Sequence, residues 1–322
     1  MNLIVFDLEW NQCPDGKAHE IPQMPFEIVE IGAVRLDDRK EIIDTFRALV
    51  RPSVYEAIHP RTAEVIHLTM EELQRDGVPF PEAADAFLAW CGDDPRFCTW
   101  GTLDLMELQR NLKWYHMLNR MEGPLAYDDV QKLFALYEGK PKERKSLQDA
   151  VETLHFPEDE AFHSALDDAM YTAKILQIIP DSLIFRYYSI DSYQNPQSVE
   201  EEIRVHYDTY DKFVSREFAS KDEAMEDAEV TAVRCFICHR NVRRLVHWFS
   251  NGGRNYLAVG KCPEHGLVKS KVRMHKTENG RFYVIKTTKM IREEDADRIF
   301  YMQAHLRHRR QVRRNTRGEQ KK

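Results

Sequence analysis

Two acidic residues near the start of the chain are well placed to do chemistry. Asp7 and Glu9 follow the apolar run Leu3–Phe6, which predicts a buried strand. Because side chains alternate along a strand, both carboxylates are expected to project from one face of it. Two carboxylates held together away from water repel each other, and a divalent cation such as Mg²⁺ or Mn²⁺ offsets that repulsion. From this pair alone, the alternative is an ordinary solvated strand end with two surface acids.

Two later segments supply groups of the same kind. Asp104 is expected in the first turn of a helix that follows a short buried strand at residues 97–100. His163 stands just ahead of another predicted helix and Asp168 near its start, where the helix dipole favours a carboxylate. Taken singly, Asp104 is a helix-start acid and His163 a surface residue. Taken in order, the acids and the histidine form a candidate catalytic set.

This ordered set resembles the DEDDh 3′–5′ exonucleases of the RNase H-like superfamily. The shared pattern is Asp-x-Glu, a distant Asp, and then His-x-Ala-x-x-Asp, which here is Asp7, Glu9, Asp104, His163 and Asp168, with Ala165 in place. Segments 26–34, 46–52 and 62–69 also resemble the family, so the likeness covers approximately residues 1–180. The branch that looks most similar contains the RNA-trimming exonucleases of histone mRNA and small RNAs.

The resemblance implies a role for each residue of the set. Four carboxylates would hold two Mg²⁺ or Mn²⁺ ions, which serve the attacking and leaving oxygens of phosphodiester hydrolysis. Asp7 would bridge both ions, Glu9 and Asp168 would complete one site, and Asp104 would support the other. His163 would take the proton from the attacking water, since an imidazole titrates near neutrality.

Two neighbouring positions bear on this assignment. The five-residue step from His163 leads to Asp168, so Asp167 is expected to be exposed or to lie behind the metal ligands. The other branch of the superfamily carries Tyr four residues before the last Asp. This sequence has Ser164 at that position, which disfavours that branch.

Charge is distributed very unevenly along the 322 residues. The net charge is −7, but residues 231–322 hold 23 Lys and Arg against 7 Asp and Glu, whereas residues 1–230 hold 23 against 46. The acidic part should repel a polyanion except at its metal ions, and a basic part restores affinity by neutralising phosphates. The alternative is that the acidic and basic parts dock on each other.

The basic part contains a metal-binding motif. Cys235, Cys238, Cys262 and His265 form a C-x-x-C…C-x-x-H pattern, which predicts one structural Zn²⁺ in a zinc ribbon with a β-hairpin between the pairs. The alternatives are buried free thiols with a chance histidine, or His239 as the fourth ligand.

Basic and aromatic side chains alternate through this ribbon, as single-strand binding requires. The candidate phosphate contacts are Arg243, Arg244, Lys269 and Lys271. Trp10 and Met24 are candidates for stacking on a terminal base, with core packing as the alternative for Trp10. The basic run 307–322 is expected either as a helix extending from Glu293 or as a disordered arm.

These observations predict an α/β protein with an RNase H-like mixed sheet and a small β-rich zinc ribbon. The expected function is metal-dependent 3′–5′ removal of nucleotides from single-stranded ends, with RNA favoured over DNA as partner. A non-catalytic nucleic-acid-binding protein and a zinc-ribbon adaptor are the alternatives. We expect a cytoplasmic protein without a membrane span.

The expected domains are an exonuclease domain (1–180), an acidic linker (181–230), a basic ribbon (231–291) and a basic tail (292–322). The expected elements are strands at 2–8, 27–36 and 43–51 and helices at 104–116, 147–154 and 165–178.

Overall fold

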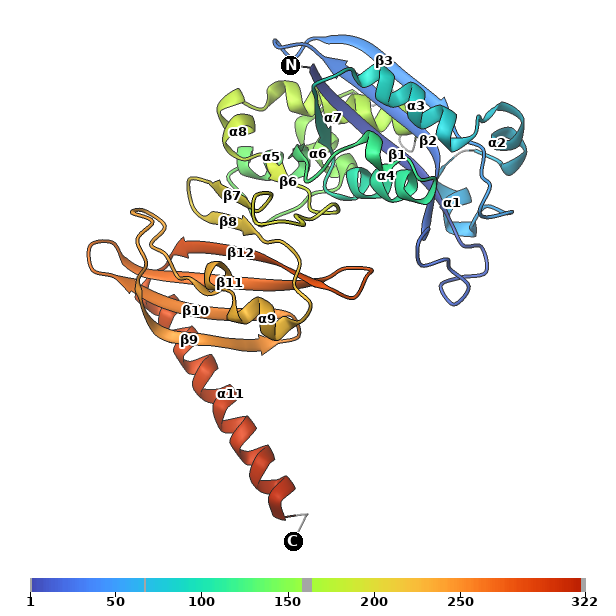
Figure 1. The fold of residues 1–322 in the computed structure, drawn as a ribbon. Helices are drawn as coiled ribbons and strands as arrows, with labels where there is room; N and C mark the ends of the chain where they lie inside the picture. The colour runs from blue at the N-terminus through green and yellow to red at the C-terminus, as the bar shows by residue number, and fades with distance from the viewer. Residues whose placement is uncertain (1, 67, 158–163, 320–322) are drawn as a thin grey trace. The chain divides into compact units, whose positions relative to one another are not determined.

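The structure is a computed structural model that describes residues 2–66, 68–157 and 164–319 (Figure 1). Internal contacts divide the chain into two compact units, Met1–Gln194 and Asn195–Lys322. The first unit contains the acidic residues of the candidate catalytic set. The second contains the cysteine and histidine motif and the basic segments.

The first unit is built on a six-stranded mixed sheet with the strand order β3-β2-β1-β4-β5-β6. β1, β2 and β3 are antiparallel neighbours, β4 pairs parallel with β1, and β5 pairs parallel with β4. β1 therefore lies inside the sheet, with paired strands on both sides. The strands are β1 (Asn2–Gln12), β2 (Phe26–Leu36), β3 (Ile42–Leu49), β4 (Pro95–Thr99), β5 (Ala126–Asp129) and β6 (Ser189–Ile190).

Helices cover both faces of this sheet, because β1 is apolar on both sides. Ile4 and Phe6 pack on one face with residues of α3 and α4, and Leu3 and Val5 pack on the other with residues of α5, α6 and α7. The predicted α/β class and the six predicted elements are confirmed, with bounds that differ by a few residues. The helices are α1 (Pro60–Val65), α2 (Met70–Asp76), α3 (Phe80–Cys91), α4 (Leu103–Trp114), η1 (Leu118–Arg120), α5 (Val130–Tyr137), α6 (Leu147–Leu154), α7 (Ala165–Ile178) and α8 (Asp181–Arg186).

The second unit is a six-stranded antiparallel sheet with the order β7-β8-β12-β11-β10-β9. Val272 and Met274 of β11 pack on one face against α9 and α10, and Leu257 and Val259 of β10 pack on the other against α11. The elements are β7 (Ile203–His206), β8 (Asp211–Val214), α9 (Lys221–Glu226), α10 (Ala228–Thr231), β9 (Arg243–Gly252), β10 (Asn255–Cys262), β11 (Gly266–Lys276), β12 (Phe282–Met290) and α11 (Glu293–Glu319).

Two segments expected outside the domains are parts of the two units. Within the expected linker 181–230, β6 pairs with β5 in the first sheet, and β8 pairs with β12 in the second. Pairing of β8 satisfies backbone groups that β12 would otherwise expose at an edge. The expected tail begins as the helix α11, whose Ala296 and Ile299 are buried against β9 and β10. No helix in the described part of the chain has the length and apolarity of a membrane span.

Candidate active site

Three carboxylates from two elements converge in the first unit. Asp7 and Glu9 project from β1 toward the face that α7 covers, and Asp168 lies in the first turn of α7. One carboxylate oxygen of each lies within 4.8 Å of the others. Alternation along β1 explains the first two, as the sequence predicts, and the start of α7 brings the third.

A glycine allows α7 to begin directly above the sheet. Gly32 of β2 is paired with Asp7. A methyl group in place of its hydrogen would come within 2.1 Å of the carbonyl carbon of Ala165 and of the amide nitrogen of Leu166. The backbone of α7 therefore needs glycine at this position, and the close approach brings Asp168 beside Asp7.

Asp104 approaches the same carboxylates from a third element. It lies in the first turn of α4 and is only 5% exposed. Its carboxylate accepts hydrogen bonds from the backbone N–H of Leu8 and from its own backbone N–H. Because Leu8 lies between Asp7 and Glu9, this bond ties the start of α4 to the part of β1 that carries the other acids.

Burial and mutual repulsion raise the pKa of these carboxyls. Burial raises the pKa of Glu9 to about 8, and repulsion from Asp168, Glu30 and Asp104 adds to the effect. Burial also raises the pKa of Asp104 to about 7. The pKa of Asp7 is raised well above its usual range, first by burial and then by the surrounding carboxylates. Without a cation these carboxyl groups retain protons near neutral pH. A divalent cation bound among them would offset their mutual repulsion and favour the ionised form.

Glu30 is a further carboxylate that the sequence pattern did not single out. It is paired with Glu9 across β1 and β2 and is 1% exposed. The Nε atom of Arg47 donates a hydrogen bond to its Oε1 atom at 2.6 Å, so Glu30 has a cationic partner of its own. Only the register of β1 and β2 could have indicated Glu30 in advance, because that register places it opposite Glu9.

The other residues expected at this site differ in their surroundings. His163 lies outside the described residues. Asp167 lies outside the close carboxylate group and is partly buried. Met24 is fully buried, so it offers no surface to a base and is not a candidate contact in this structure. Trp10 packs with the cluster on the opposite sheet face, with its ring centroid 5.5 Å from that of Phe26, so core packing applies to it.

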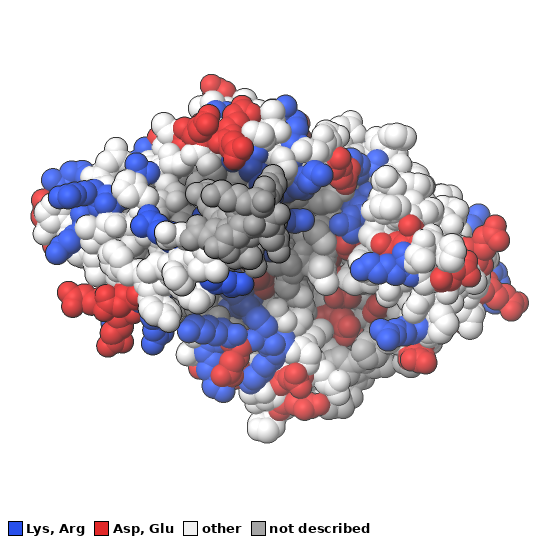
Figure 2. Space-filling model, turned by 90° about the horizontal axis from the view of Figure 1, so that it is seen from below, with Lys and Arg blue, Asp and Glu red and all other residues white. Residues whose placement is uncertain are grey.

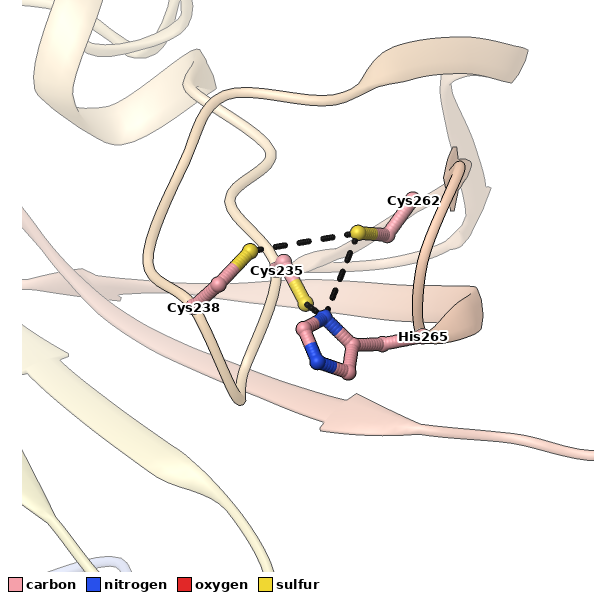
Figure 3. A group of neighbouring side chains, drawn as sticks. All are labelled: Cys235, Cys238, Cys262 and His265. Carbon is pink, nitrogen blue, oxygen red and sulfur yellow. Dashed lines mark hydrogen bonds between the residues drawn. The ribbon is translucent and has the colours of Figure 1, made fainter.

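The four residues of the cysteine and histidine motif lie together in the second unit (Figure 3). The Cys238 and Cys262 sulfurs are 3.9 Å apart, and the Nδ1 atom of His265 lies 3.6 Å from the Cys235 sulfur and 3.5 Å from the Cys262 sulfur. Tetrahedral zinc with Zn–S bonds of about 2.3 Å and Zn–N bonds of about 2.0 Å separates its ligands by about 3.5–3.8 Å. The donor set and its spacing therefore fit zinc.

A neighbouring cation favours thiolate at this cluster. A hydrogen bond from Arg240 lowers the pKa of the Cys238 thiol to about 6. The alternative ligand His239 lies elsewhere, with its Nδ1 atom 3.8 Å from an Asp211 oxygen. The remaining cysteines, Cys13, Cys91 and Cys98, are buried and form no disulfide.

The predicted phosphate contacts occupy two parts of the second sheet. Arg243 and Arg244 are exposed at the start of β9. Lys269 and Lys271 alternate along β11 on one sheet face, and Lys269 is paired with Lys289 of β12. The pKa of Lys269 is lowered by burial and then by Lys289 and Lys271, so cations crowd this face. Figure 2 shows Lys and Arg gathered in patches on the face that it draws, with Asp and Glu beside and among them.

Residues 4–176 match the family model RNase_T, described as exonuclease. The chain belongs to this exonuclease family. The match spans more than half of the chain and includes Asp7, Glu9, Asp104 and Asp168, whereas the second unit lies outside it. The predicted enzyme class, a phosphodiester hydrolase of the exonuclease type, is therefore confirmed. The predicted exonuclease family and the RNase H-like α/β class are confirmed as well.

Solved structures of exonucleases are similar to this chain at low identity. The nuclease domain of 3′hExo, a DEDDh family member bound to rAMP, is 20% identical, with 59% of this chain and 96% of that chain covered and a TM-score of 0.49. A 3′-exonuclease that recognises the histone mRNA stem-loop is 20% identical over 61% and 92%, with a TM-score of 0.48. The zinc-bound E. coli ExoI–ssDNA complex is 15% identical over 57% and 42%, with a TM-score of 0.45. No curated protein matches the sequence.

Proposed function

We propose that this exonuclease removes nucleotides from the 3′ end of single-stranded nucleic acid with the help of two divalent cations. The observation that carries the proposal is the convergence of Asp7, Glu9 and Asp168 within 4.8 Å, with Asp104 bound to the same stretch of β1. Sites that hydrolyse phosphodiesters with two cations need several carboxylates at one place.

The chemistry of the donor set fits Mg²⁺ or Mn²⁺, which prefer oxygen ligands. Asp7, Glu9 and Asp168 would hold one ion, and Asp7 with Asp104 would hold the other. Bound there, the ions would polarise the scissile phosphate and lower the pKa of water. The raised pKa values support this assignment, because a crowded set of carboxyls gains most from a cation that displaces their protons.

The residues of the chain contribute position and proton transfer. The Leu8 N–H fixes Asp104, and Gly32 allows α7 to hold Asp168 in place, so the carboxylates are oriented before a substrate arrives. His163 precedes α7 by two residues in the sequence, and we propose it as the base that accepts the proton of the attacking water.

We further propose that RNA is preferred over DNA and that the second unit binds the strand. Lys269 and Lys271 share a face of β11 with Arg273, and all three are lysine or arginine residues on alternating positions of one strand. A row of cations on one strand suits a phosphate backbone. The Cys235, Cys238, Cys262 and His265 group would hold one structural Zn²⁺ that closes the loops beside this sheet.

The test uses one oligonucleotide sequence, as RNA and as DNA, labelled at either the 5′ or the 3′ end. The full chain is incubated with each strand in Mg²⁺, in Mn²⁺ or in EDTA, beside Asp7→Ala and His163→Ala. A ladder from the 5′-labelled strand, together with early release of the 3′ label, is expected in either metal. EDTA and both variants should abolish it.

Asp38→Ala provides the matched control, because Asp38 is an exposed acid in the loop after β2. It should trim at the parent rate. If neither polymer is shortened in any metal, or if Asp7→Ala trims as fast as the parent, the proposal is wrong and the first unit acts as a binding domain.

A further inference from the structure

A second group of metal-ligating side chains lies in the second unit, apart from the cysteine cluster. His206, Asp211 and His239 each place one ligand atom within 4.8 Å of the others. The His206 Nδ1 atom lies 2.5 Å from the Asp211 Oδ1 atom, and the His239 Nδ1 atom lies 3.8 Å from Asp211 Oδ2. The two imidazole ring centroids are 5.0 Å apart.

The β7–β8 hairpin fixes two of these groups. His206 and Asp211 are paired residues at the ends of the two strands, so their side chains lie on the same sheet face. The connecting turn is anchored by Tyr207, which is 2% exposed, whose N–H bonds to the Tyr210 carbonyl and whose ring stacks on that of Tyr210. The pair is therefore built on a firmly held turn.

The first cysteine loop supplies the third group. His239 directly follows Cys238 and adopts a left-handed conformation, with φ of 57°, which is unfavourable for a residue other than glycine. Its N–H bonds to the Cys235 carbonyl, so the loop holds that conformation. In the same loop, the Phe236 ring stacks on the His206 ring at 4.8 Å. Two residues of this loop, Phe236 and His239, thus contact the His206 ring.

The surroundings leave room for an exchangeable ligand. All three residues line a cavity of about 320 Å³, and the side chains of His206 and His239 are 54% and 58% exposed. Three protein ligands with open positions are typical of metal sites that exchange their fourth ligand, whereas structural zinc has four protein ligands.

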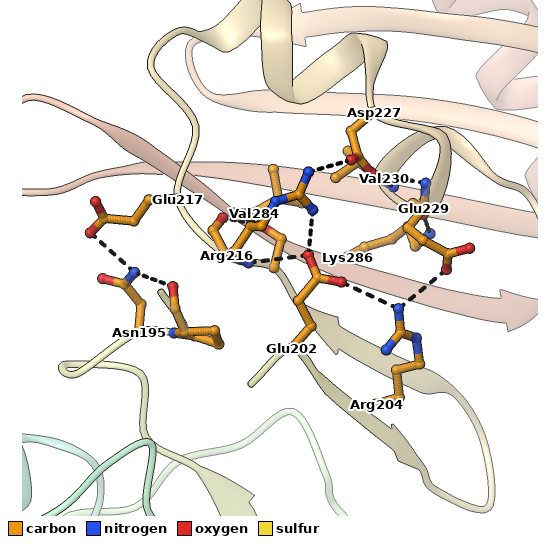
Figure 4. A network of polar contacts seen from close by, with 12 residues as sticks. Asn195, Glu202, Arg204, Arg216, Glu217, Asp227, Glu229, Val230, Val284 and Lys286 are labelled. Carbon is orange, nitrogen blue, oxygen red and sulfur yellow. Dashed lines mark hydrogen bonds and ion pairs between the residues drawn. The ribbon is translucent and has the colours of Figure 1, made fainter. Parts of the chain in front are cut away.

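Acids pair with Arg204 and Arg234 on the cavity wall, which Lys212 and Lys286 also line. Arg204 lies 3.3 Å from Glu202 and 3.4 Å from Glu229, and Arg234 forms a second ion pair with Glu229. Figure 4 shows Arg204 between the two glutamates, with Lys286 beside them. These ion pairs limit the repulsion that the arginines would exert on a bound cation.

We propose that His206, Asp211 and His239 form a second site for a transition-metal ion, one that prefers imidazole, such as Zn²⁺ or Co²⁺. Ligands of one tetrahedral ion lie about 3.4 Å apart. Binding therefore releases the proton shared by His206 and Asp211, replaces their hydrogen bond and moves the Nδ1 and Oδ1 atoms about 1 Å further apart. Two exposed side chains accommodate that change by small rotations. The competing account is a hydrogen-bonded His–Asp pair with a neighbouring histidine and no metal.

The experiment counts the Co²⁺ ions that bind to the metal-stripped full chain in equilibrium dialysis. Excess Mg²⁺ is present because it occupies carboxylate sites and binds imidazole only weakly. The parent should bind two Co²⁺, one with thiolate-to-cobalt charge-transfer absorption and one without. His206→Ala should weaken the thiolate-free ion by more than about 100-fold. His247→Ala, which removes an exposed histidine of β9, should retain it.

The thiolate-free ion should also broaden the imidazole NMR signals of His206 and His239 in the parent, a result that does not depend on how a variant folds. The proposal is overturned if no thiolate-free ion binds, if His206→Ala retains that ion, or if Asp7→Asn removes it. The last result would assign the ion to the carboxylates of the first unit.

Discussion

Replacing Glu9 by glutamine separates its charge from its shape. In the metal-free protein, burial and neighbouring carboxylates raise the pKa of Glu9 from 4.5 to about 8. Between about pH 4.5 and about pH 8 the folded state therefore holds a proton that the unfolded state has lost. As a result, the free energy of unfolding falls as the pH rises through this range. The loss is complete above the folded pKa.

The size of the effect follows from the shift. One pKa unit corresponds to about 1.4 kcal/mol, so between about pH 5.5 and about pH 8 Glu9 alone would account for about 3 kcal/mol. Because Glu9 keeps partial contact with solvent, we expect about half of that. Glu9→Gln should therefore reduce the pH-dependent loss of stability by about 1.5 kcal/mol and should weaken stabilisation by Mg²⁺.

The measurement is amide hydrogen exchange of β1 and β2 in EDTA at the two pH values, which reports local stability even when the two units unfold separately. Glu56→Gln, which neutralises an exposed glutamate, should behave as the parent. If Glu9→Gln and the parent lose protection equally, the carboxylates do not interact as described.

Further predictions concern the packing, the metals and the strand. Gly32→Ala should destabilise the first unit by about 1–3 kcal/mol, because the added methyl forces α7 away from the sheet, and should slow trimming more than tenfold; chemical unfolding and single-turnover rates measure the two effects. Cys235→Ser should lose the thiolate-bound ion. Amide hydrogen-exchange protection should then be lost in β9 to β12 and persist in β1 to β3, whereas equal protection with and without the ion would contradict a structural role for that ion. Stabilisation by Mn²⁺ should grow as the pH rises toward about 8, because fewer protons then need to be displaced, and a thermal-shift series that is flat with pH would oppose this. Replacing Lys269 and Lys271 by alanine should weaken RNA binding. The steepness of the plot of log binding constant against log salt concentration should fall by about 1 for each phosphate that is no longer neutralised, whereas an unchanged slope would show that the strand does not bind at this face of β11.

The first unit could be predicted largely from local sequence patterns. The apolar run before Asp7 specifies a strand, and its alternation specifies the face that carries both carboxylates. Met24 shows the limit of this reasoning, since a residue in a connecting loop gives no pattern from which its complete burial could be inferred. The close approach of α7 to Gly32 likewise depends on tertiary packing.

The second unit was less predictable because its sheet combines distant segments. The motif spacing was enough to bring Cys235 and His265 together, since each pair lies in one short loop. The pairing of β8 with β12 joins residues separated by about 70 positions, and no local pattern specifies such a pair. The same is true of His239, whose approach to Asp211 depends on the left-handed conformation of its backbone.

The central claim is most directly tested by two adjacent residues of α7. Asp168→Asn and Asp167→Asn make the same chemical change one position apart, and only Asp168 belongs to the converging carboxylates. On a 5′-end-labelled single strand in Mg²⁺, Asp167→Asn should give the parent's ladder and Asp168→Asn should give uncut substrate. Equal trimming by both variants, or a block in Asp167→Asn alone, would contradict the account.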